Sequence, residues 1–181
     1  MYRMPLVVAL ATAAGLGVAL AQTGAPSSAP AGPRGATVPA GDREFAMKAA
    51  AAGLAEVTES NAVAEKTSNP DVKRIAQHLI EDHTKANNEL IQIAQSLDLS
   101  LPKEPDTTDR RRIDRLSAAK GRDLDRDYLA DQKTAHEEAI RLFTEESKNG
   151  KNEKLRSFAS QTLPKLQEHY KMVTSVRVSA R

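Results

Sequence analysis

The sequence predicts an all-α domain, a four-helix bundle, behind a cleavable export signal and a flexible segment. Residues that favour helices (Ala, Leu, Glu, Lys, Gln and Arg) dominate the chain beyond residue 41. Apolar residues recur there at spacings of three and four, and no segment alternates with the period of a strand. Asn-Pro and Asn-Gly signals, with a Pro-containing connector, divide this part into four long helices.

The first 21 residues have the pattern of a signal peptide. Arg3 precedes an apolar stretch from Leu6 to Leu20, and Ala19-Leu20-Ala21 is a small-x-small cleavage pattern. The stretch has about 15 residues, fewer than the ~20 that a spanning helix needs. We therefore expect cleavage after Ala21, with an uncleaved membrane anchor as the alternative. The chain has no cysteine, which excludes disulfides, thiolate sites and a lipid attached through cysteine.

Residues 22–41 are predicted to be a flexible linker, and residues 42–178 to be the bundle domain. Pro, Gly, Ser and Ala fill the linker, which has too little apolar bulk to offset the entropy of ordering.

The first hairpin is predicted from two amphipathic segments. Asp42 is expected to cap a helix that ends near Thr67. The next helix has Asn69 as its N-cap and Pro70 at its first position, and it ends before Pro102. The inward residues expected on these two helices are Phe45, Ala49, Ala52, Glu56, Val63, Val72, Ile75, Leu79, Ala86, Leu90, Ile93 and Leu97.

The second hairpin follows a long connection. A short helix is expected near 107–119, closed by Gly121, followed by long helices near 122–148 and 152–177. Pro164 lies inside the last helix, where it removes a backbone hydrogen bond and predicts a kink. The middle connection could return along the bundle or leave a simple up-and-down topology, and the helix pattern leaves both open.

The charge balance indicates no nucleic-acid partner. Lys and Arg exceed Asp and Glu by only two, and aromatic residues make up 3% of the chain. The basic run at 110–112 has aspartates on both sides, so we interpret it as a solvated face with local ion pairs. The alternatives are contact with a membrane surface or with another envelope protein, and the partner is otherwise unknown.

Three of the four histidines lie on apolar stripes. His83, His136 and His169 each fall three or four residues from an apolar neighbour, and Glu56 has the same place on the first helix. Glu56 lies 13 residues before Asn69 and His83 lies 14 after it, so both are expected at one level across the hairpin. The remaining histidine, His78, is interpreted as a surface partner of Glu81.

Two interpretations of Glu56, His83, His136 and His169 are open. In the first, Glu–His hydrogen bonds merely fix the register of the bundle. In the second, the four side chains bind one divalent ion, with zinc, iron, manganese or copper suited to imidazole and carboxylate ligands. Around such a site, Asp82, Asp125 and Tyr128 are candidates to orient the ligands, or else solvated boundary residues. No catalytic residue is predicted.

The segment from Phe45 to about Val176 resembles bacterial domain-of-unknown-function family 4142. The resemblance rests on FAMKAAAAGLAEV, SNPDVKRIAQHLIEDHTKAN, GRDLDRDYL, AHEEAI and TLPKLQEHY, which follow one another in this order. It implies a ferritin-like four-helix bundle in an exported protein, and the helix expected near 107–119 would be a short extra helix between the second and third long helices. Ferritin-like di-iron sites use Glu-x-x-His pairs, and no histidine here has a glutamate three residues before it.

We therefore expect an exported module of the periplasm or cell envelope. The leading hypothesis is a non-enzymatic protein that acts through its surface or supports the envelope under stress. The alternative is a bundle that binds a divalent metal through one inward glutamate and three histidines. An enzyme would need a pocket near Tyr128 and His136.

Overall fold

The computed structural model describes residues 37–177, which form five α-helices without a strand. These are α1 (Ala40–Lys66), α2 (Pro70–Ser96), α3 (Thr107–Ala118), α4 (Gly121–Asn149) and α5 (Glu153–Ser175). The predicted signal peptide, most of the predicted linker and residue 178 lie outside the described residues.

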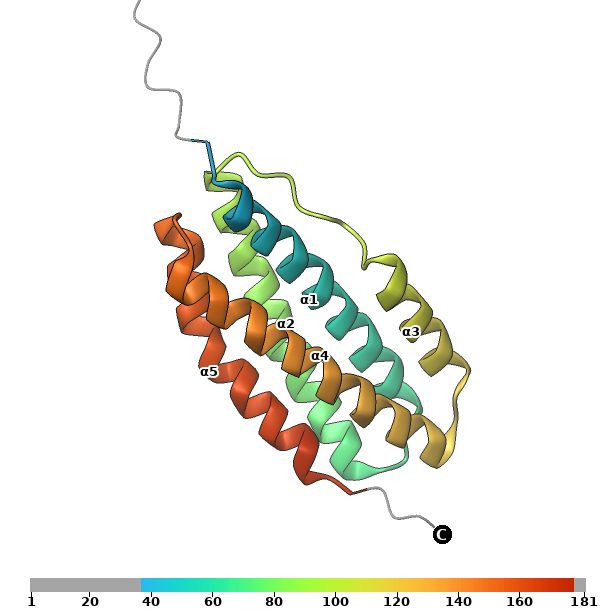
Figure 1. Cartoon of the computed structure of the whole chain (residues 1–181). Coiled ribbons are helices and arrows are strands. Elements are labelled where there is room, and N and C mark those ends of the chain that lie inside the picture. Colours follow the sequence, from blue (N-terminus) through green and yellow to red (C-terminus); the bar gives the residue numbers. More distant parts are fainter. Residues whose placement is uncertain (1–36, 178–181) are drawn as a thin grey trace, which may run out of the picture. The chain divides into compact units, whose positions relative to one another are not determined.

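The helices form a bundle in which the middle connection runs the length of the molecule. α1 and α2 make one antiparallel hairpin, and α4 and α5 make the other (Figure 1). The connector after α2 and then α3 run back along the bundle, so α2 and α4 point the same way. α1 packs on α4, and α2 packs on α5. This settles the open topology: the fold is the ferritin-like bundle, with the short extra helix where it was predicted.

Side-chain caps define the starts of three helices. The Asn69 side chain accepts from the backbone N–H groups of Asp71 and Val72 and begins α2. Asp106 and Asn152 begin α3 and α5 in the same way. Each cap satisfies N–H groups that have no partner within the helix.

The predicted cap of α1 is wrong. α1 begins at Ala40, three residues earlier than a cap at Asp42 would place it, and no side chain caps it. The Asp42 carboxylate instead accepts hydrogen bonds from the backbone N–H groups of Lys151 and Asn152. A long-range partner therefore replaces the local one, and it ties the start of α1 to the α4–α5 turn.

Two other predicted boundaries differ in detail. α3 ends at Ala118, and Gly121 opens α4 rather than closing α3; its φ of +56° is one that glycine adopts without strain. α5 continues through Pro164, whose ring is exposed, and the kink stays a prediction.

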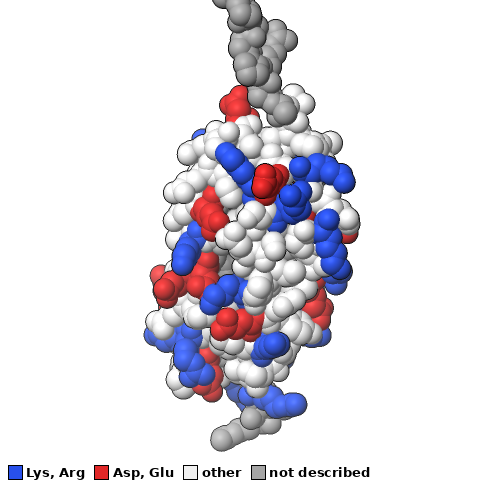
Figure 2. All heavy atoms as spheres, turned by 90° about the vertical axis from the view of Figure 1, so that its left-hand side faces the viewer, with Lys and Arg blue, Asp and Glu red and all other residues white. Residues whose placement is uncertain are grey.

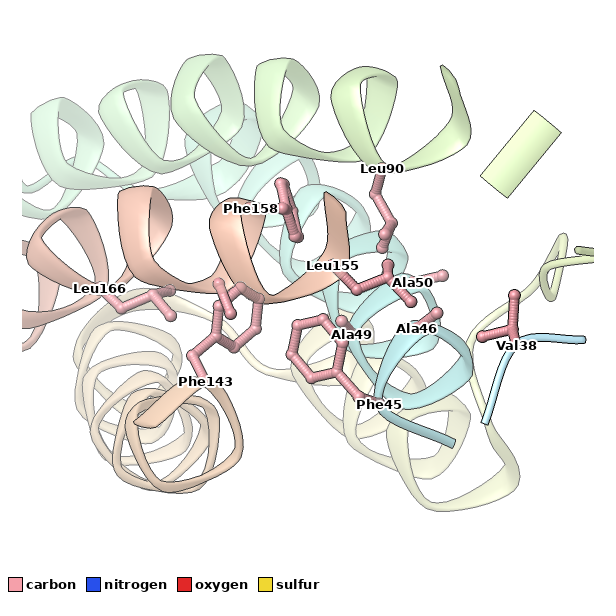
Figure 3. Packing of buried hydrophobic residues seen from close by; sticks show 11 residues of the cluster. Val38, Phe45, Ala46, Ala49, Ala50, Leu90, Phe143, Leu155, Phe158 and Leu166 are labelled. Carbon is pink, nitrogen blue, oxygen red and sulfur yellow. The ribbon is translucent and has the colours of Figure 1, made fainter. Parts of the chain in front are cut away.

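The apolar core has two parts, one toward each end of the bundle. The first, shown in Figure 3, surrounds Phe45, Phe143 and Phe158 and includes Leu90 and Leu155. The second contains Val63, Val72, Ile75, Ala76, Leu79, Leu116, Leu124, Tyr128, Leu129 and Val173. Ala52, predicted to face inward, is exposed because that side of α1 borders an open groove and no neighbouring helix covers it.

A polar layer separates these two apolar parts. Along each long helix, buried polar residues stand between residues of the first part and residues of the second. The layer consists of Glu56, Glu59, Ser60, His83, Gln132, His136 and His169, all of them buried.

The outer surface carries charges of both signs. On the face seen in Figure 2, Lys and Arg alternate with Asp and Glu and neither sign forms a continuous field. Within residues 37–177, no helix combines the length and the apolar content that crossing a bilayer requires.

Candidate metal centre

Three helices from the two hairpins bring three imidazoles together. His83 comes from α2, His136 from α4 and His169 from α5, and their exposed fractions are 8%, 1% and 2%. The ring centroids are 5.5 Å apart for His83 and His136, 5.3 Å for His83 and His169, and 5.4 Å for His136 and His169. The three rings therefore form a nearly equilateral cluster inside the bundle.

Each ring of this cluster has a buried nitrogen without a hydrogen-bond partner. Nδ1 of His136 lies 2.8 Å from the carbonyl oxygen of Gln132 and donates its proton there. Nε2 of the same ring is therefore unprotonated and has a free lone pair. Nε2 of His169 lies 3.0 Å from the Asp82 carboxylate, which leaves Nδ1. The unpartnered atoms are Nε2 of His83, Nε2 of His136 and Nδ1 of His169.

The distances are close to those of a metal site. One ligating nitrogen from each of the three rings lies within 4.8 Å of the others. Zinc is held at about 2.0–2.1 Å from imidazole nitrogen, so small rotations of the rings would bring three nitrogens onto one ion. The anchored second nitrogens of His136 and His169 match the outer hydrogen bonds that metal-binding histidines make.

Burial keeps these imidazoles neutral. It lowers the pKa of His83 well below its ordinary value, assisted by His136 and His169. Burial also lowers the pKa of His136, against the opposing effect of the Gln132 carbonyl. The pKa of His169 falls to about 4 through burial, although Asp82 partly offsets this. At neutral pH all three are in the form that binds a cation.

Glu56 lies beside the cluster with an unpartnered oxygen. Its Oε2 is 4.0 Å from Nε2 of His83, too far for a hydrogen bond, and both atoms are buried without partners. Burial raises the pKa of Glu56 to about 8, so the carboxyl is largely protonated at pH 7 unless a cation approaches. The hydrogen bond that would fix the register of the hairpin is thus not formed at this distance.

Sequence reasoning missed the part that His78 plays. The His78 ring packs edge-on against His169, with centroids 5.5 Å apart, and its Nε2 is 3.5 Å from the Asp82 carboxylate. Lys165 lies 3.7 Å from the same carboxylate oxygen. The spacing of four between His78 and Asp82 was the available signal, because it puts both on one face of α2. The predicted pairing with Glu81 overlooked it.

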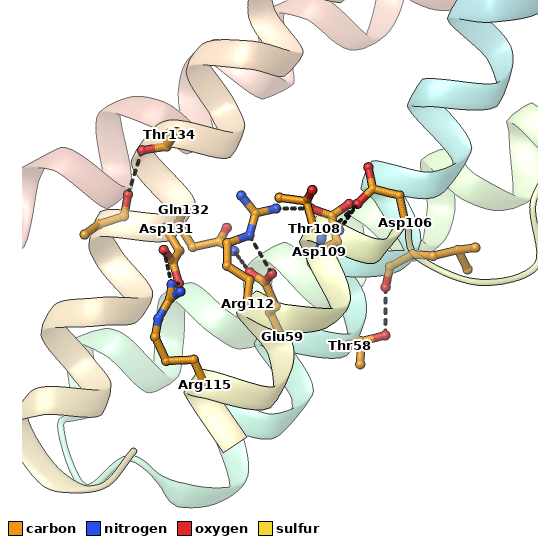
Figure 4. Close-up of polar contacts among 12 residues, drawn as sticks. Thr58, Glu59, Asp106, Thr108, Asp109, Arg112, Arg115, Asp131, Gln132 and Thr134 are labelled. Atoms are coloured by element: carbon orange, nitrogen blue, oxygen red, sulfur yellow. Dashed lines mark hydrogen bonds and ion pairs between the residues drawn. The ribbon is translucent and has the colours of Figure 1, made fainter. Parts of the chain in front are cut away.

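A second polar group adjoins Glu56 and was also missed. Glu59, one turn further along α1 and 1% exposed, accepts from Arg112 Nε at 3.1 Å and from the Gln132 amide at 3.2 Å (Figure 4). Arg112 also pairs with Asp109. Burial, with repulsion from Glu56, raises the pKa of Glu59 to about 8. The basic run is therefore not wholly a solvated face: its third arginine docks α3 onto α1.

Asp82, Asp125 and Tyr128 have different places. Asp82 hydrogen-bonds His169, as an orienting residue would. Asp125 instead accepts from the Thr67 hydroxyl at 2.5 Å, and this bond holds the end of α1 against α4. The Tyr128 hydroxyl lies 2.8 Å from that of Ser60. For Asp125 and Tyr128 the predicted orienting role has no hydrogen bond behind it, because their polar atoms are engaged elsewhere.

Comparison with solved structures shows the same fold in proteins of low sequence identity. A DUF305 protein from Streptomyces coelicolor, proposed to be secreted, matches with a TM-score of 0.65 and 14% identity, over 75% of this chain and 89% of its own. A DUF305 fragment from Deinococcus radiodurans matches with a TM-score of 0.68 and 10% identity, over 76% of this chain and 95% of its own.

Comparison by sequence places the chain in a family. No curated protein matches it. The model of a domain of unknown function, DUF4142, matches residues 25–176. This range includes the three histidines, Glu56 and all five helices. This agrees with the resemblance carried by the sequence blocks, and the chain belongs to the DUF4142 family.

Proposed function

We propose that this protein is an exported metal-binding bundle that holds one divalent ion between His83, His136 and His169, with Glu56 as a fourth ligand. The observation that carries the proposal is a set of three buried histidines, each with an unpartnered ring nitrogen, that bring one ligating nitrogen apiece within 4.8 Å of one another. A bound ion would give all three a partner.

The competing interpretation, a purely structural polar layer, accounts less well for these atoms. A buried polar atom without a partner costs about 1–3 kcal/mol, so a layer kept for stability should pair its own members. Glu59 and Gln132 of this layer do pair, but the pair that the register interpretation needs, Glu56 and His83, is separated by 4.0 Å. The geometry thus favours metal binding over hydrogen bonds that only fix the register of the bundle. The sequence alone ranked these two hypotheses in the opposite order.

The ligand set favours a transition metal. Neutral imidazoles suit zinc, copper and iron, whereas magnesium and calcium prefer oxygen ligands. The absence of thiolate and of a Glu-x-x-His pair on the histidine helices argues for a single ion rather than a di-iron site. Removal of the proton from Glu56 would add the negative charge that a divalent ion favours.

Export is part of the same proposal. It rests on the signal pattern of residues 1–21, and it agrees with the proposed secretion of the structurally similar Streptomyces coelicolor protein. In the periplasm or cell envelope such a bundle would take up or hold metal without catalysing a reaction.

The test is metal analysis of the exported chain, purified without an affinity tag. We expect the metal-free protein to bind about one equivalent of zinc, and cobalt(II) in its place to give the intense visible bands of a four-coordinate ion. The His83→Ala, His136→Ala double variant should lose both signals. His78→Ala tells this cluster from a neighbouring one, since His78, Asp82 and His169 also bring ligand atoms within 4.8 Å of one another, and it should leave zinc binding unchanged.

The two hypotheses give opposite results. If the native chain and the double variant bind zinc equally weakly and both fold, the metal proposal fails. What remains is a helical envelope module without a metal.

A further inference from the structure

Two hollows meet at the seam between α1 and α4. One is a cavity of about 40 Å³ beside His83, His136 and Glu56, bounded on its other sides by Asn87, Thr162 and mostly apolar side chains such as Leu90 and Phe158. The other is an open groove of about 490 Å³, which the connector before α3 and α3 itself border through Pro102 and Arg112.

The cavity and the groove share a wall. Ala49, Ala52, Glu56, Ala135, Ala139 and Phe143 line both of them. Four of these six are alanines, two from α1 and two from α4, so small methyl groups make up most of the wall between the two hollows. Ala52 is exposed and stands on the groove side, whereas Glu56 is buried.

Unpartnered polar atoms line this route. Glu56 is 6% exposed, its Oε2 has no partner, and the residue borders both hollows. Nε2 of His83 and Nε2 of His136 belong to the cavity wall and are unpartnered as well. A small molecule that entered from the groove would therefore meet the carboxyl first and the ring nitrogens next.

The size and charge of the route define what can use it. A water molecule needs at least about 10–15 Å³ measured in this way, so 40 Å³ holds a ligand of about two or three heavy atoms. Asp106, Asp109 and Glu138 outweigh Lys48 and Arg112 in the groove, which disfavours anions. The mostly apolar wall and the small volume of the cavity disfavour any ion that carries its hydration shell.

We infer that the α1–α4 seam is the entrance to the histidine cluster, and that a neutral ligand of two or three heavy atoms binds in the cavity as a fifth ligand of the bound ion, beside the Glu56 carboxyl. The inference rests on the proposed function and adds to it a second binding partner. In this inference the ligand reaches the cavity between α1 and α4, and α5, which does not line the groove, takes no part in its entry.

The first test uses nitric oxide as the probe on the full chain loaded with iron(II). We expect an adduct with the electron paramagnetic resonance signal of a spin-3/2 iron–nitrosyl. Ala52→Leu should slow its formation by at least tenfold without changing the iron content, because the larger side chain fills the seam. Thr58→Leu is the matched control, an exposed position on α1 that borders neither hollow.

The second test needs no metal. Xenon dissolved under pressure should shift the methyl NMR signals of Ala49, Ala135 and Ala139 in the metal-free chain, and Ala52→Leu should weaken or slow this effect. Xenon is neutral and close to the expected ligand in size.

The outcomes separate the two proposals. Iron that binds without forming an adduct, or an adduct that forms equally fast in Ala52→Leu, overturns the entrance while the metal proposal stands. The entrance is also overturned if Ala52→Leu slows iron uptake but not nitric oxide binding, since the seam would then be a route for the metal. If no iron binds, the ligand at the ion fails, while the zinc titration decides the metal proposal; the xenon shifts then decide whether the cavity and its entrance exist.

Discussion

Two clusters of three aromatic rings lie inside the same bundle and differ in what they leave unsatisfied. Phe45, Phe143 and Phe158 have centroid separations of 5.0, 5.8 and 6.4 Å, and the three histidines of the polar layer have separations of 5.3–5.5 Å. Both clusters are mostly edge-to-face, the arrangement that aromatic rings prefer. The phenyl rings need no further partner, whereas each imidazole leaves one buried nitrogen without one.

The two clusters occupy the same faces of the helices that they share. On α4, His136 and Phe143 are two turns apart, and on α5, Phe158 and His169 are three turns apart. Helix packing thus places the imidazoles as it places the phenyl rings. The comparison indicates that the fold would tolerate apolar residues at positions 83, 136 and 169. Packing alone therefore does not explain why imidazole nitrogens are buried there.

The largest expected effect is on the phenylalanine side. Phe45→Ala should lower the free energy of unfolding of the metal-free protein by about 3–5 kcal/mol, because it opens a cavity in a closely packed core. The zinc dissociation constant should change by no more than about twofold, since distant sites are nearly independent. Urea unfolding and zinc titration measure the two quantities. Equal losses in both would show that the clusters are one cooperative unit.

Converting one cluster toward the other should give the next largest effect. His136→Phe should weaken zinc binding by more than about a hundredfold, since it removes a ligand itself. The metal-free protein should keep its stability within about 1 kcal/mol or gain some, because a buried unpartnered nitrogen disappears. Calorimetric titration and urea unfolding test the two halves of this prediction. A strongly destabilised metal-free variant would mean that the histidine serves the fold.

A smaller effect on zinc binding is expected from a residue that only orients an imidazole and is not itself a ligand. Asp82→Asn should weaken zinc binding about 10- to 100-fold, because His169 loses the carboxylate that orients its ring. Glu81→Gln removes a neighbouring exposed carboxylate and is the control. If the two variants bind zinc equally well, Asp82 does not orient a ligand.

The smallest effect concerns pH and tests the phenylalanine end alone. Burial, with repulsion from Asp42, raises the pKa of Glu146 to about 7. Because the folded pKa lies above the unfolded value near 4.5, its contribution to stability is complete below pH 4.5 and is lost as the pH rises through 7. Glu146→Gln should therefore gain about 1 kcal/mol relative to the native protein on going from pH 5 to pH 8, after screening by nearby solvent.

Thermal or urea unfolding of the metal-free protein at the two pH values measures this gain, and Glu145→Gln on the exposed side of α4 is the control. If the free energies of unfolding of the native protein and of Glu146→Gln change equally between pH 5 and pH 8, the Glu146 carboxyl is hydrated and the prediction is wrong.

The sequence predicted what depends on position along a helix. Glu56 and His83 could be placed at one level by counting from Asn69, because α1 ends and α2 begins at that turn. His169 could not be placed in the same way, since the proline at 164 predicted a kink before it and no short turn links α5 to α2. Its position beside His83 follows from the packing of α2 on α5.

What the sequence could not supply depends on the rotation of one helix against another. Nothing in the run at 110–112 distinguishes Arg112, which docks on Glu59, from its two exposed neighbours. Asp42 has the sequence signature of a local cap, yet its partners lie more than 100 residues away. His78 was assigned to the surface because only its own helix was considered, whereas its ring meets α5.

The return path of α3 has one further consequence. It puts the two hairpins far apart in sequence, so the contact between Asp82 and His169 spans 87 residues. A ligand shared by α2, α4 and α5 would close that large loop, and closing long loops restricts the unfolded chain most. In a protein without cysteine, such an ion would do the work of a cross-link, with the difference that a chelator could remove it and return the two halves to independence.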